Sequence, residues 1–307
     1  MALKCGIIGI TNSGKSTLFN CISDTKTEIT NFAFSTNKSN LGNIKVPDIR
    51  LEKLEELQPT EKVVPTEVNI VDVPGLAKGS NKGEGVGNKF LSDIRNTDAL
   101  IHVIRCFDDD NLPHIDGSVN PVRDMETVEL ELQVKDLESV EKKISKVEKL
   151  VRAGEKEAKN ELEILTKYKD HLESFQSART LDISEEEREV AKDMQLLTEK
   201  PVLYVCNVDE SSAVEGNKYT KQLIEAIDHK DDILIIAAAA EAEITELETE
   251  EEREEFLKDM GLNEPGVNKL IRASYNMLNL QSFFTIGPKE IRAWTIKKGM
   301  NAQKAAG

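Results

Sequence analysis

The sequence contains few cysteines, and their positions exclude a disulfide framework. Only four of its 307 residues are cysteines, and they lie far apart. Cys5, Cys106 and Cys206 stand inside apolar segments typical of strands, where a cysteine is usually a small buried hydrophobe. We therefore expect neither disulfides nor a cysteine metal site.

Long apolar segments and an excess of positive charge are also missing. No segment approaches the roughly 20 apolar residues of a membrane-spanning helix, and none resembles a secretory signal. The protein is thus predicted to be cytoplasmic, with no membrane partner. Its 40 Lys and Arg residues are outnumbered by 56 Asp and Glu residues, which gives a net charge of -16. This charge argues against a sequence-independent hold on nucleic acid through the whole surface but leaves room for one basic face.

Alternating strand and helix patterns fill the first part of the chain. Strands are indicated by the apolar runs LKCGIIGI, VNIVDVP and ALIHVIRCF, and helices by the intervening TLFNCISD and KFLSDIRNT. Strands that alternate with helices predict an α/β fold with a parallel sheet. The strand pattern returns after Pro201 as VLYVCNV and DILIIAAAA, so we expect the same sheet to continue there.

Residues 126–198 carry a different pattern, that of an antiparallel helical coiled coil inserted into the α/β domain. Two apolar runs follow helical spacing, and Arg152, Ala153 and Gly154 offer the break between them. Ser184 and Glu187 form a capping box for a third, short helix. The two runs are Leu137, Val140, Ile144, Val147 and Val151, then Leu162, Leu165, Leu172 and Phe175.

The same segment carries a strip of positive charge at helical spacing. Two interpretations stay open: a solvated helix face opposite the apolar seam, or a basic face that binds RNA or a protein partner. The strip consists of Lys142, Lys146, Lys149, Arg152 and Lys156. Farther along, residues 246–258 predict an acidic surface helix, and FFTIGPKEIRAWTI predicts two short strands around Gly-Pro, before the start of a further helix.

The segment GITNSGKS, residues 9–16, is a complete P-loop between a strand and a helix. Its glycines let backbone N–H groups turn toward the phosphates of a nucleotide. Lys15 is expected to reach the β- and γ-phosphate oxygens and to take part in catalysis, and the Ser16 hydroxyl is expected to ligate Mg²⁺. Thr17 is expected to support the α-phosphate.

The segment IVDVPGLAKG, residues 70–79, predicts the second half of a magnesium and γ-phosphate site. Asp72, at the end of a strand, would anchor Mg²⁺ through water, and the N–H of Gly75 would sense the γ-phosphate. A preceding polar stretch supplies a threonine that closes on the metal. We assign this role to Thr36, although spacing alone would equally allow Thr30.

The segment CNVDE, residues 206–210, stands where guanine nucleotidases carry their base-reading Asn-Lys-x-Asp motif. Glu210 is one methylene longer than the aspartate that binds guanine there, and Val208 replaces the lysine that covers the base. We therefore expect weak guanine selectivity, with adenine read by Asn207 and by backbone groups near Val208.

Taken together, these motifs resemble the YchF branch of the Obg-type translation-factor P-loop nucleotidases. The matching stretches cover nearly the whole chain and include NSGKSTLFN, VPDIRLEKL, NVDE, FFTIGPKEIRAWTI and the long DVPGLAKGSNKGEGVGNKFLSDIRNTDALIHVIRCF. The resemblance implies binding and hydrolysis of ATP, often in preference to GTP, and association with ribosomes. It also implies that Asn12, Ser13 and Gly14 join Lys15, Ser16 and Thr17 in holding phosphate, and that the backbone of Val208 contacts adenine.

This resemblance gives the expected division of the chain. Residues 1–125 and 199–278 would form the nucleotidase domain, residues 126–198 the inserted helical coiled-coil domain, and residues 279–307 the N-terminal part of a β-grasp (TGS) module. The preferred interpretation is a slow ATPase switch that binds the ribosome or ribosomal RNA. A GTPase with the same fold and a non-catalytic, nucleotide-gated scaffold are the alternatives.

Leu76 stands where switch nucleotidases usually carry the glutamine that orients the attacking water. A leucine side chain makes no hydrogen bond, so another group must place this water. One candidate is His114, in the loop DDDNLPHIDGSVNP, and the alternative interpretation of a surface-loop histidine stays open. By family resemblance, a second candidate is a K⁺ ion near Asn12. Both interpretations predict slow basal hydrolysis.

Overall fold

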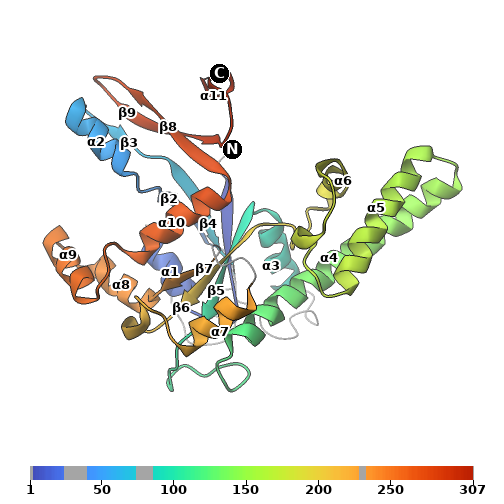
Figure 1. Cartoon of the computed structure of the whole chain (residues 1–307), viewed down its shortest axis with the longest axis horizontal. Coiled ribbons are helices and arrows are strands. Elements are labelled where there is room, and N and C mark those ends of the chain that lie inside the picture. Colours follow the sequence, from blue (N-terminus) through green and yellow to red (C-terminus); the bar gives the residue numbers. More distant parts are fainter. Residues whose placement is uncertain (1–2, 24–39, 74–85, 228–232, 307) are drawn as a thin grey trace. The chain divides into compact units, whose positions relative to one another are not determined.

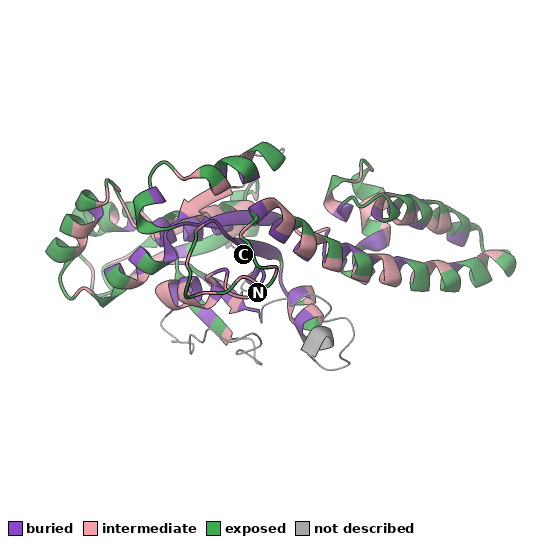
Figure 2. Cartoon of the chain, turned by 90° about the horizontal axis from the view of Figure 1, so that it is seen from below, coloured by how far each residue is buried: buried purple, intermediate pink, exposed green. Residues whose placement is uncertain are grey.

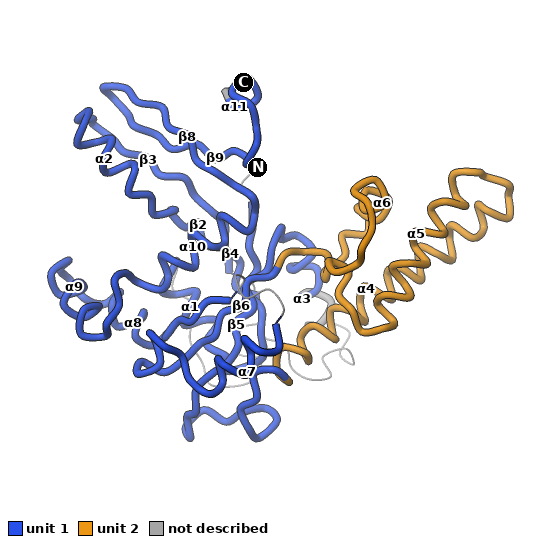
Figure 3. The backbone as a smooth tube through the Cα atoms, viewed as in Figure 1, with its two compact units in different colours: residues 1–122, 202–307 blue, residues 123–201 orange. Residues whose placement is uncertain are grey.

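The computed structural model describes residues 3–23, 40–73, 86–227 and 233–306 (Figure 1). The chain divides into two compact units, which are described separately (Figure 3). The first unit consists of residues 1–122 and 202–307, and the second of residues 123–201. No helix within the described ranges has both the length and the apolar content that crossing a membrane requires.

The first unit is built on a six-stranded sheet in the order β2-β4-β1-β5-β6-β7. Five strands are parallel, as the sequence predicts: β1 (Lys4–Ile8), β4 (Glu67–Asp72), β5 (Ala99–Arg105), β6 (Val202–Asn207) and β7 (Ile233–Ile236). The edge strand β2 (Asn40–Lys45) pairs antiparallel with β4, so the sheet is mixed. Every residue of the central strands β5 and β6 is buried, whereas β2 alternates between buried and more exposed residues.

Helices α1 (Lys15–Ile22), α8 (Ala238–Glu246) and α10 (Gly266–Met277) supply much of the core against the sheet. Leu18 and Phe19 of α1 and Leu270 of α10 are fully buried in this cluster. Figure 2 shows the strands of the sheet largely in purple, the colour of buried residues. The prediction of one strand over DILIIAAAA is wrong in its second half, because the alanines Ala238–Ala240 begin α8. Alanine has the highest helix propensity, and the hydrogen bonds of a new helix compete successfully with a longer strand there.

Further helices of the first unit lie outside that cluster. They are α3 (Val86–Arg95), α7 (Lys218–Ala226) and α9 (Glu250–Asp259). Helix α9 overlaps the predicted acidic segment, residues 246–258, and starts with a capping box formed by Thr249 and Glu252. Asn217 caps α7 in the same way, with its side chain accepting the N–H groups of Tyr219 and Thr220.

A second, three-stranded sheet has the order β3-β9-β8. Strands β8 (Leu280–Ile286) and β9 (Ile291–Lys297) form the predicted hairpin around Gly-Pro and are followed by α11 (Ala302–Ala306). The third strand, β3 (Val63–Val64), comes from the early part of the chain. Helix α2 (Ile49–Leu57) covers this sheet: Leu51 and Leu54 pack with Val63, Phe284, Ile291 and Ala293.

The second unit has its own core. Helices α4 (Pro121–Arg152) and α5 (Lys156–Glu173) end and begin at the predicted break, and α6 (Glu185–Ala191) starts with the predicted Ser184–Glu187 capping box. Both apolar runs pack into one cluster except at their last member, Phe175. The prediction for Phe175 is wrong: α5 ends at Glu173, Phe175 has a φ of 58°, and 71% of its surface is exposed.

A buried carboxylate joins α4 to the returning chain in this unit. Asp136 is fully buried, and its two carboxylate oxygens accept the N–H groups of Leu197 and Thr198 at 2.8 and 2.7 Å. The hydroxyl of Thr198 donates a third bond to Asp136 at 2.7 Å. These bonds satisfy backbone donors that would otherwise be buried and unpaired.

Candidate functional site

The P-loop runs from the end of β1 to the start of α1 in a shape that requires glycine at two places. Gly9 and Gly14 have φ angles of 149° and 96°. A Cβ atom on Gly9 would lie 2.3 Å from the carbonyl oxygen of Val103, and one on Gly14 would lie 2.1 Å from Nδ2 of Asn207. No side chain caps α1 at Gly14, so the helix N-terminus presents its N–H groups in the geometry that binds phosphate.

Lys15, Ser16 and Asp72 lie together at this turn. Lys15 is 7% exposed, and its Nζ donates to the carbonyl oxygen of Ile10 at 2.7 Å. Burial lowers the pKa of Lys15 to about 8, while the negative charge of Asp72 opposes that shift. The hydroxyl of Ser16 donates to Oδ2 of Asp72 at 3.3 Å.

The Asp72 carboxylate fits a magnesium site. Burial raises the pKa of Asp72, and the neighbouring Lys15 and the bond from Ser16 act in the opposite direction. Within the described ranges, Oδ1 of Asp72 and Oγ of Ser13 are buried and have no hydrogen-bond partner. Carboxylate and hydroxyl oxygens are ligands that Mg²⁺ prefers, so Ser16 and Asp72 together offer a suitable pair. The predicted partners Thr36 and Gly75, with Thr30 and Leu76, lie outside the described residues.

Asn207 ties the P-loop to the strand and helix on its other side. Its Nδ2 donates to the carbonyl oxygen of Ser13 at 2.9 Å, and its Oδ1 accepts the N–H of Ala238, at the start of α8, at 3.0 Å. The side chain is only 5% exposed. These contacts give Asn207 a scaffolding role, and a direct contact with the base stays a prediction.

The remaining residues of the predicted base motif lie at the end of β6. Val208 is 2% exposed, and its N–H donates to the carbonyl oxygen of Ile236 at 3.0 Å. Glu210 is exposed at the start of a short 3₁₀ turn. Asp209 accepts the hydroxyls of Ser211 and Ser212 at 2.5 and 3.0 Å, and the bond from Ser211 contributes most to lowering its pKa. Its carboxylate is thereby used within the turn.

The loop that carries His114 contacts the P-loop directly. Nδ2 of Asn12 donates to the carbonyl oxygen of Pro113, the residue before His114, at 3.2 Å. Asn12 has a φ of 62°, and His114 is half-buried, with its Nδ1 accepting the N–H of Asp116 at 3.1 Å. In the neutral imidazole, this bond assigns the proton to Nε2. His114 is thus adjacent to the loop expected to hold phosphate.

The buried guanidinium of Arg105 was not identified from the sequence. Arg105 is the last residue of β5, is 2% exposed, and donates to the carbonyl oxygens of Phe107, Asp109 and Leu112. A charged residue at the end of an otherwise apolar strand is a signal that could have pointed to it.

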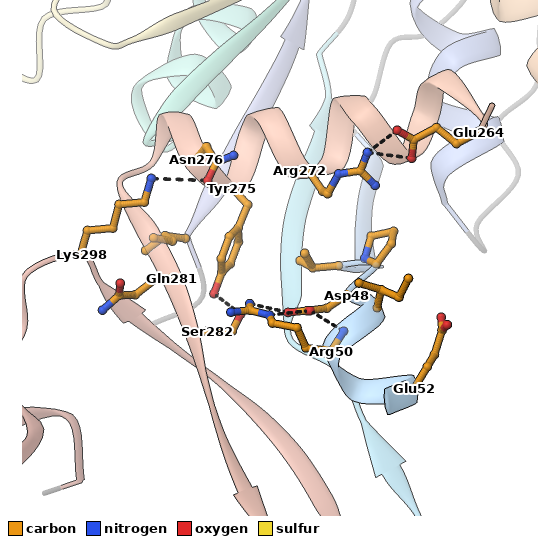
Figure 4. A pocket seen from close by; sticks show the side chains of 14 residues that line it. Asp48, Arg50, Glu52, Glu264, Arg272, Tyr275, Asn276, Gln281, Ser282 and Lys298 are labelled. Atoms are coloured by element: carbon orange, nitrogen blue, oxygen red, sulfur yellow. Dashed lines mark hydrogen bonds and ion pairs between the residues drawn. The ribbon is translucent and has the colours of Figure 1, made fainter. Parts of the chain in front are cut away.

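A cavity lies between α2, α10 and β8, and none of the P-loop residues lines it (Figure 4). It measures about 670 Å³. The charged side chains that line it largely satisfy one another: Arg50 binds Asp48 at 2.7 and 2.8 Å, and Arg272 binds Glu264 at 2.5 and 2.7 Å. Each pair lies within one segment: Asp48 caps α2, which carries Arg50, and Glu264 lies just before α10, which carries Arg272. A contact between α10 and β8 comes instead from the hydroxyls of Tyr275 and Ser282, which lie 3.1 Å apart.

All members of the basic strip are exposed on the helical unit. The carboxylate of Glu148 lies 3.7 Å from the guanidinium of Arg152, one turn away on the same helix. Exposure is expected for both a solvated face and a binding face, so it does not distinguish the two interpretations of the strip. A contact with RNA or protein stays a prediction. The strip consists of Lys142, Lys146, Lys149, Arg152 and Lys156.

Two family models match the chain. The family described as "50S ribosome-binding GTPase" matches residues 4–208, and the YchF C-terminal family, described as a "protein of unknown function", matches residues 280–307. The first match includes the P-loop, Asp72, Arg105 and Asn207. The second includes the β8–β9 hairpin.

Curated relatives match over the full length of this chain. It is 46% identical over 310 residues to the "Ribosome-binding ATPase YchF" of Bacillus subtilis and 45% identical over 308 residues to that of Escherichia coli O157:H7; both alignments cover 100% of this chain and 84% of the relative. Among solved structures, the YchF GTPase of Schizosaccharomyces pombe is similar with a TM-score of 0.84 and 36% identity, covering 99% of this chain and 83% of that one.

Proposed function

Because this chain belongs to the YchF family of P-loop nucleotide hydrolases, we propose that it is a slow, Mg²⁺-dependent ATPase that acts as a nucleotide-controlled switch on the ribosome. The observation that carries this proposal is the grouping of Lys15, Ser16 and Asp72 at the uncapped N-terminus of α1. A buried ammonium beside the backbone N–H groups of a helix N-terminus suits the phosphate oxygens of a nucleotide.

In this proposal the phosphates lie along residues 12–17. Lys15 would exchange the carbonyl of Ile10 for the β- and γ-phosphate oxygens and hold its proton there. Ser16 and Asp72, with Thr36, would hold Mg²⁺, which neutralises charge on the transferred phosphoryl group when bound. Gly75 would contact the γ-phosphate. Asn207 would keep Ser13 and the rest of the loop in register with the base site.

Preference for ATP over GTP rests on the backbone at Val208. Its N–H is already used by Ile236, which leaves a carbonyl acceptor as the backbone group to face the base. Adenine presents an amino donor at the position where guanine presents a carbonyl acceptor, so an acceptor in the protein favours adenine. The longer Glu210 would bind guanine poorly. The alternative, a GTPase with the same site, requires Glu210 to reach the guanine edge.

We infer that His114 places the attacking water, since Leu76 cannot. The bond from Asn12 to Pro113 supports this role by holding the preceding residue against the P-loop. A K⁺ ion is the second candidate for the missing group. Because the amide nitrogen of Asn12 is used by Pro113, its amide oxygen would be the ligand, and faster hydrolysis in K⁺ than in Na⁺ is the corresponding expectation.

Ribosome binding is proposed from the names of the curated relatives, which are ribosome-binding ATPases. The exposed strip from Lys142 to Lys156 offers a positive surface on an acidic protein, and ribosomal RNA is a polyanion. Binding through this strip would weaken steeply as salt concentration rises.

The test is multiple-turnover phosphate release with Mg²⁺ and ATP or GTP, with and without ribosomes. We expect slow release that is faster with ATP and is stimulated by ribosomes. His114→Ala should lower the stimulated rate at least about tenfold without changing nucleotide affinity, because a positioned general base contributes about 10²–10⁴-fold. Asn111→Ala, an exposed change in the same loop, is the matched control. Nucleotide binding without any turnover would instead identify a non-catalytic scaffold.

A further inference from the structure

We propose that Arg105 is a positioning residue for hydrolysis, whose guanidinium fixes the loop from Cys106 to Pro113 and thereby the place of His114. The inference rests on the proposed function, because it concerns the group that activates water at the P-loop. It adds a residue that contacts neither nucleotide nor metal in that proposal.

The guanidinium of Arg105 donates hydrogen bonds to three carbonyl groups of a single loop. Its Nε donates to Phe107 at 3.1 Å, one terminal nitrogen to Leu112 at 2.8 Å, and the other to Asp109 at 3.3 Å. Its central carbon lies 4.7 Å from the centroid of the Phe107 ring, which adds a cation–π contact. The side chain therefore fixes both ends and the middle of a six-residue turn.

Arginine suits this position for a geometric reason. Its planar fork carries five N–H donors in fixed directions, whereas a lysine ammonium is a point charge on a flexible stem. Removing a guanidinium from water is costly unless acceptors surround it. Arg105 is 2% exposed, so its N–H donors need acceptors inside the protein. The loop supplies these acceptors only in the conformation that points its three carbonyl groups at the guanidinium.

Helix α7 holds the same loop from another side. The hydroxyl of Tyr219 donates to Oδ1 of Asp108 at 2.6 Å, and Nδ2 of Asn217 donates to the carbonyl oxygen of Cys106 at 2.7 Å. The loop then ends at Pro113, whose carbonyl accepts the bond from Asn12. The loop is thus anchored at its start, in its middle and at its end, and the final contact is with the P-loop itself.

A loop anchored in this way has a specific use if His114 must lie close to the γ-phosphate. Misplacing a reacting group by about 1 Å lowers the rate by up to about 10²-fold, even when the change lies away from the chemistry. Loss of the Arg105 contacts would let His114 move while Lys15, Ser16 and Asp72 stay in place. The effect should therefore appear in kcat and leave nucleotide binding unchanged.

The experiment compares wild type, Arg105→Lys, His114→Ala and the double variant by stimulated ATP turnover and by affinity for a non-hydrolysable ATP analogue. Arg105→Lys should lower kcat about tenfold with KM and analogue affinity within about twofold of wild type. In the His114→Ala background it should cause no further loss, because the residue that it positions is gone. Arg292→Lys, which alters another arginine with two bonds to a nearby acceptor, is the control.

The outcomes of this experiment separate the possibilities. An Arg105→Lys protein that is folded and turns over at the wild-type rate overturns the inference, and so does an equal loss of kcat with and without His114. Should Arg105→Lys fail to fold, Tyr219→Phe is the substitute, since it removes the hydroxyl that donates to Asp108. A drop in kcat of about two- to fivefold that disappears in the His114→Ala background supports the inference, and unchanged turnover overturns it. A wild-type protein without any turnover overturns the proposed function itself.

Discussion

The ammonium group of Lys15 is almost entirely buried, and burial changes the pH range in which this group carries a proton. Burial lowers its pKa from the ordinary 10.5 to about 8. Between these two values the unfolded chain binds more protons than the folded protein, so stability rises with pH across that window. Below about pH 8, the buried charge opposes folding in full. The positive charge of Lys15 therefore lowers the stability of the folded protein until a phosphate binds beside it.

A bound triphosphate should restore the proton to Lys15, because negative charge beside an ammonium raises its pKa. We expect net proton uptake when Mg²⁺ and ATP bind at about pH 9 and much less at about pH 7, where Lys15 already carries its proton. Calorimetry in buffers of different ionisation enthalpy measures this uptake directly. Equal uptake at both pH values would contradict the assignment of a depressed pKa.

At the scale of elements, α8 and α10 are joined by a buried carboxylate. Oε1 of Glu241 in α8 accepts the N–H of Gly266 at 2.6 Å, and Oε2 accepts the N–H of Val267 at 3.4 Å, both in the first turn of α10. A Cβ atom on Gly266 would lie 2.9 Å from that same Oε1, so glycine permits the close approach. Burial raises the pKa of Glu241 above its ordinary value of 4.5, and the two N–H bonds act in the opposite direction.

Glu241→Ala should destabilise the fold by about 1–3 kcal/mol, because it leaves two buried N–H groups without their side-chain acceptor. Since the folded pKa of Glu241 is raised, its contribution is largest at low pH and declines as pH rises through that pKa. Urea unfolding at about pH 5 and pH 8 should thus show a larger difference between wild type and variant at pH 5. Glu243→Ala, an exposed change on the same helix, should stay within about 0.5 kcal/mol of wild type at both pH values.

The elements that could be predicted are those whose signal is local. The turn at Gly9–Ser16, the Ser184–Glu187 capping box and the break near Gly154 each follow from a few adjacent residues, and each lies where the sequence indicates. Long-range partners could not be predicted in the same way. Asn207 meets Ser13 across 194 positions, and Val63 pairs with Ile291, because only the folded sheet brings these segments together.

Two wrong predictions also have local causes that a pattern does not reveal. Phe175 continues the helical spacing of its run, but α5 ends at Glu173, two residues earlier, and Phe175 itself adopts a left-handed φ of 58°. The alanines after Ile236 continue an apolar run, and whether such a run stays extended or turns into a helix is not decided by hydrophobicity. In both cases the backbone changes direction within an unbroken apolar pattern.

At the scale of the whole molecule, the helical unit has a hydrophobic core separate from that of the six-stranded sheet. Val140, Leu165 and Tyr168 belong to the cluster of the helical unit, whereas Ile7, Phe19 and Ile101 belong to that of the sheet. Separate cores allow separate unfolding transitions, which a single-domain description would not give. Ligand binding stabilises only the unit that binds it.

Calorimetric melting should show two transitions that respond to different changes. A non-hydrolysable ATP analogue should raise the melting temperature of the sheet unit. Asp136→Ala should lower the melting temperature of the helical unit, because three buried donors lose their acceptor. The expected loss in that unit's free energy of unfolding is about 2–4 kcal/mol. Glu148→Ala, an exposed change on the same helix, is the control. A single transition that moves with both the analogue and the Asp136 variant would contradict two independent cores.

The pairing of β3 with β9 has a consequence for the order in which the protein is made. Leu51, Leu54 and Val63 leave the ribosome early, but the residues that cover them, Ile291 and Ala293, follow roughly 240 positions later. At about 5–20 residues per second, these apolar side chains wait on the order of ten to fifty seconds for their partners. During that interval, the apolar side chains of the α2 and β3 segments lack their partners on the nascent chain, and a chaperone can recognise such exposed apolar residues.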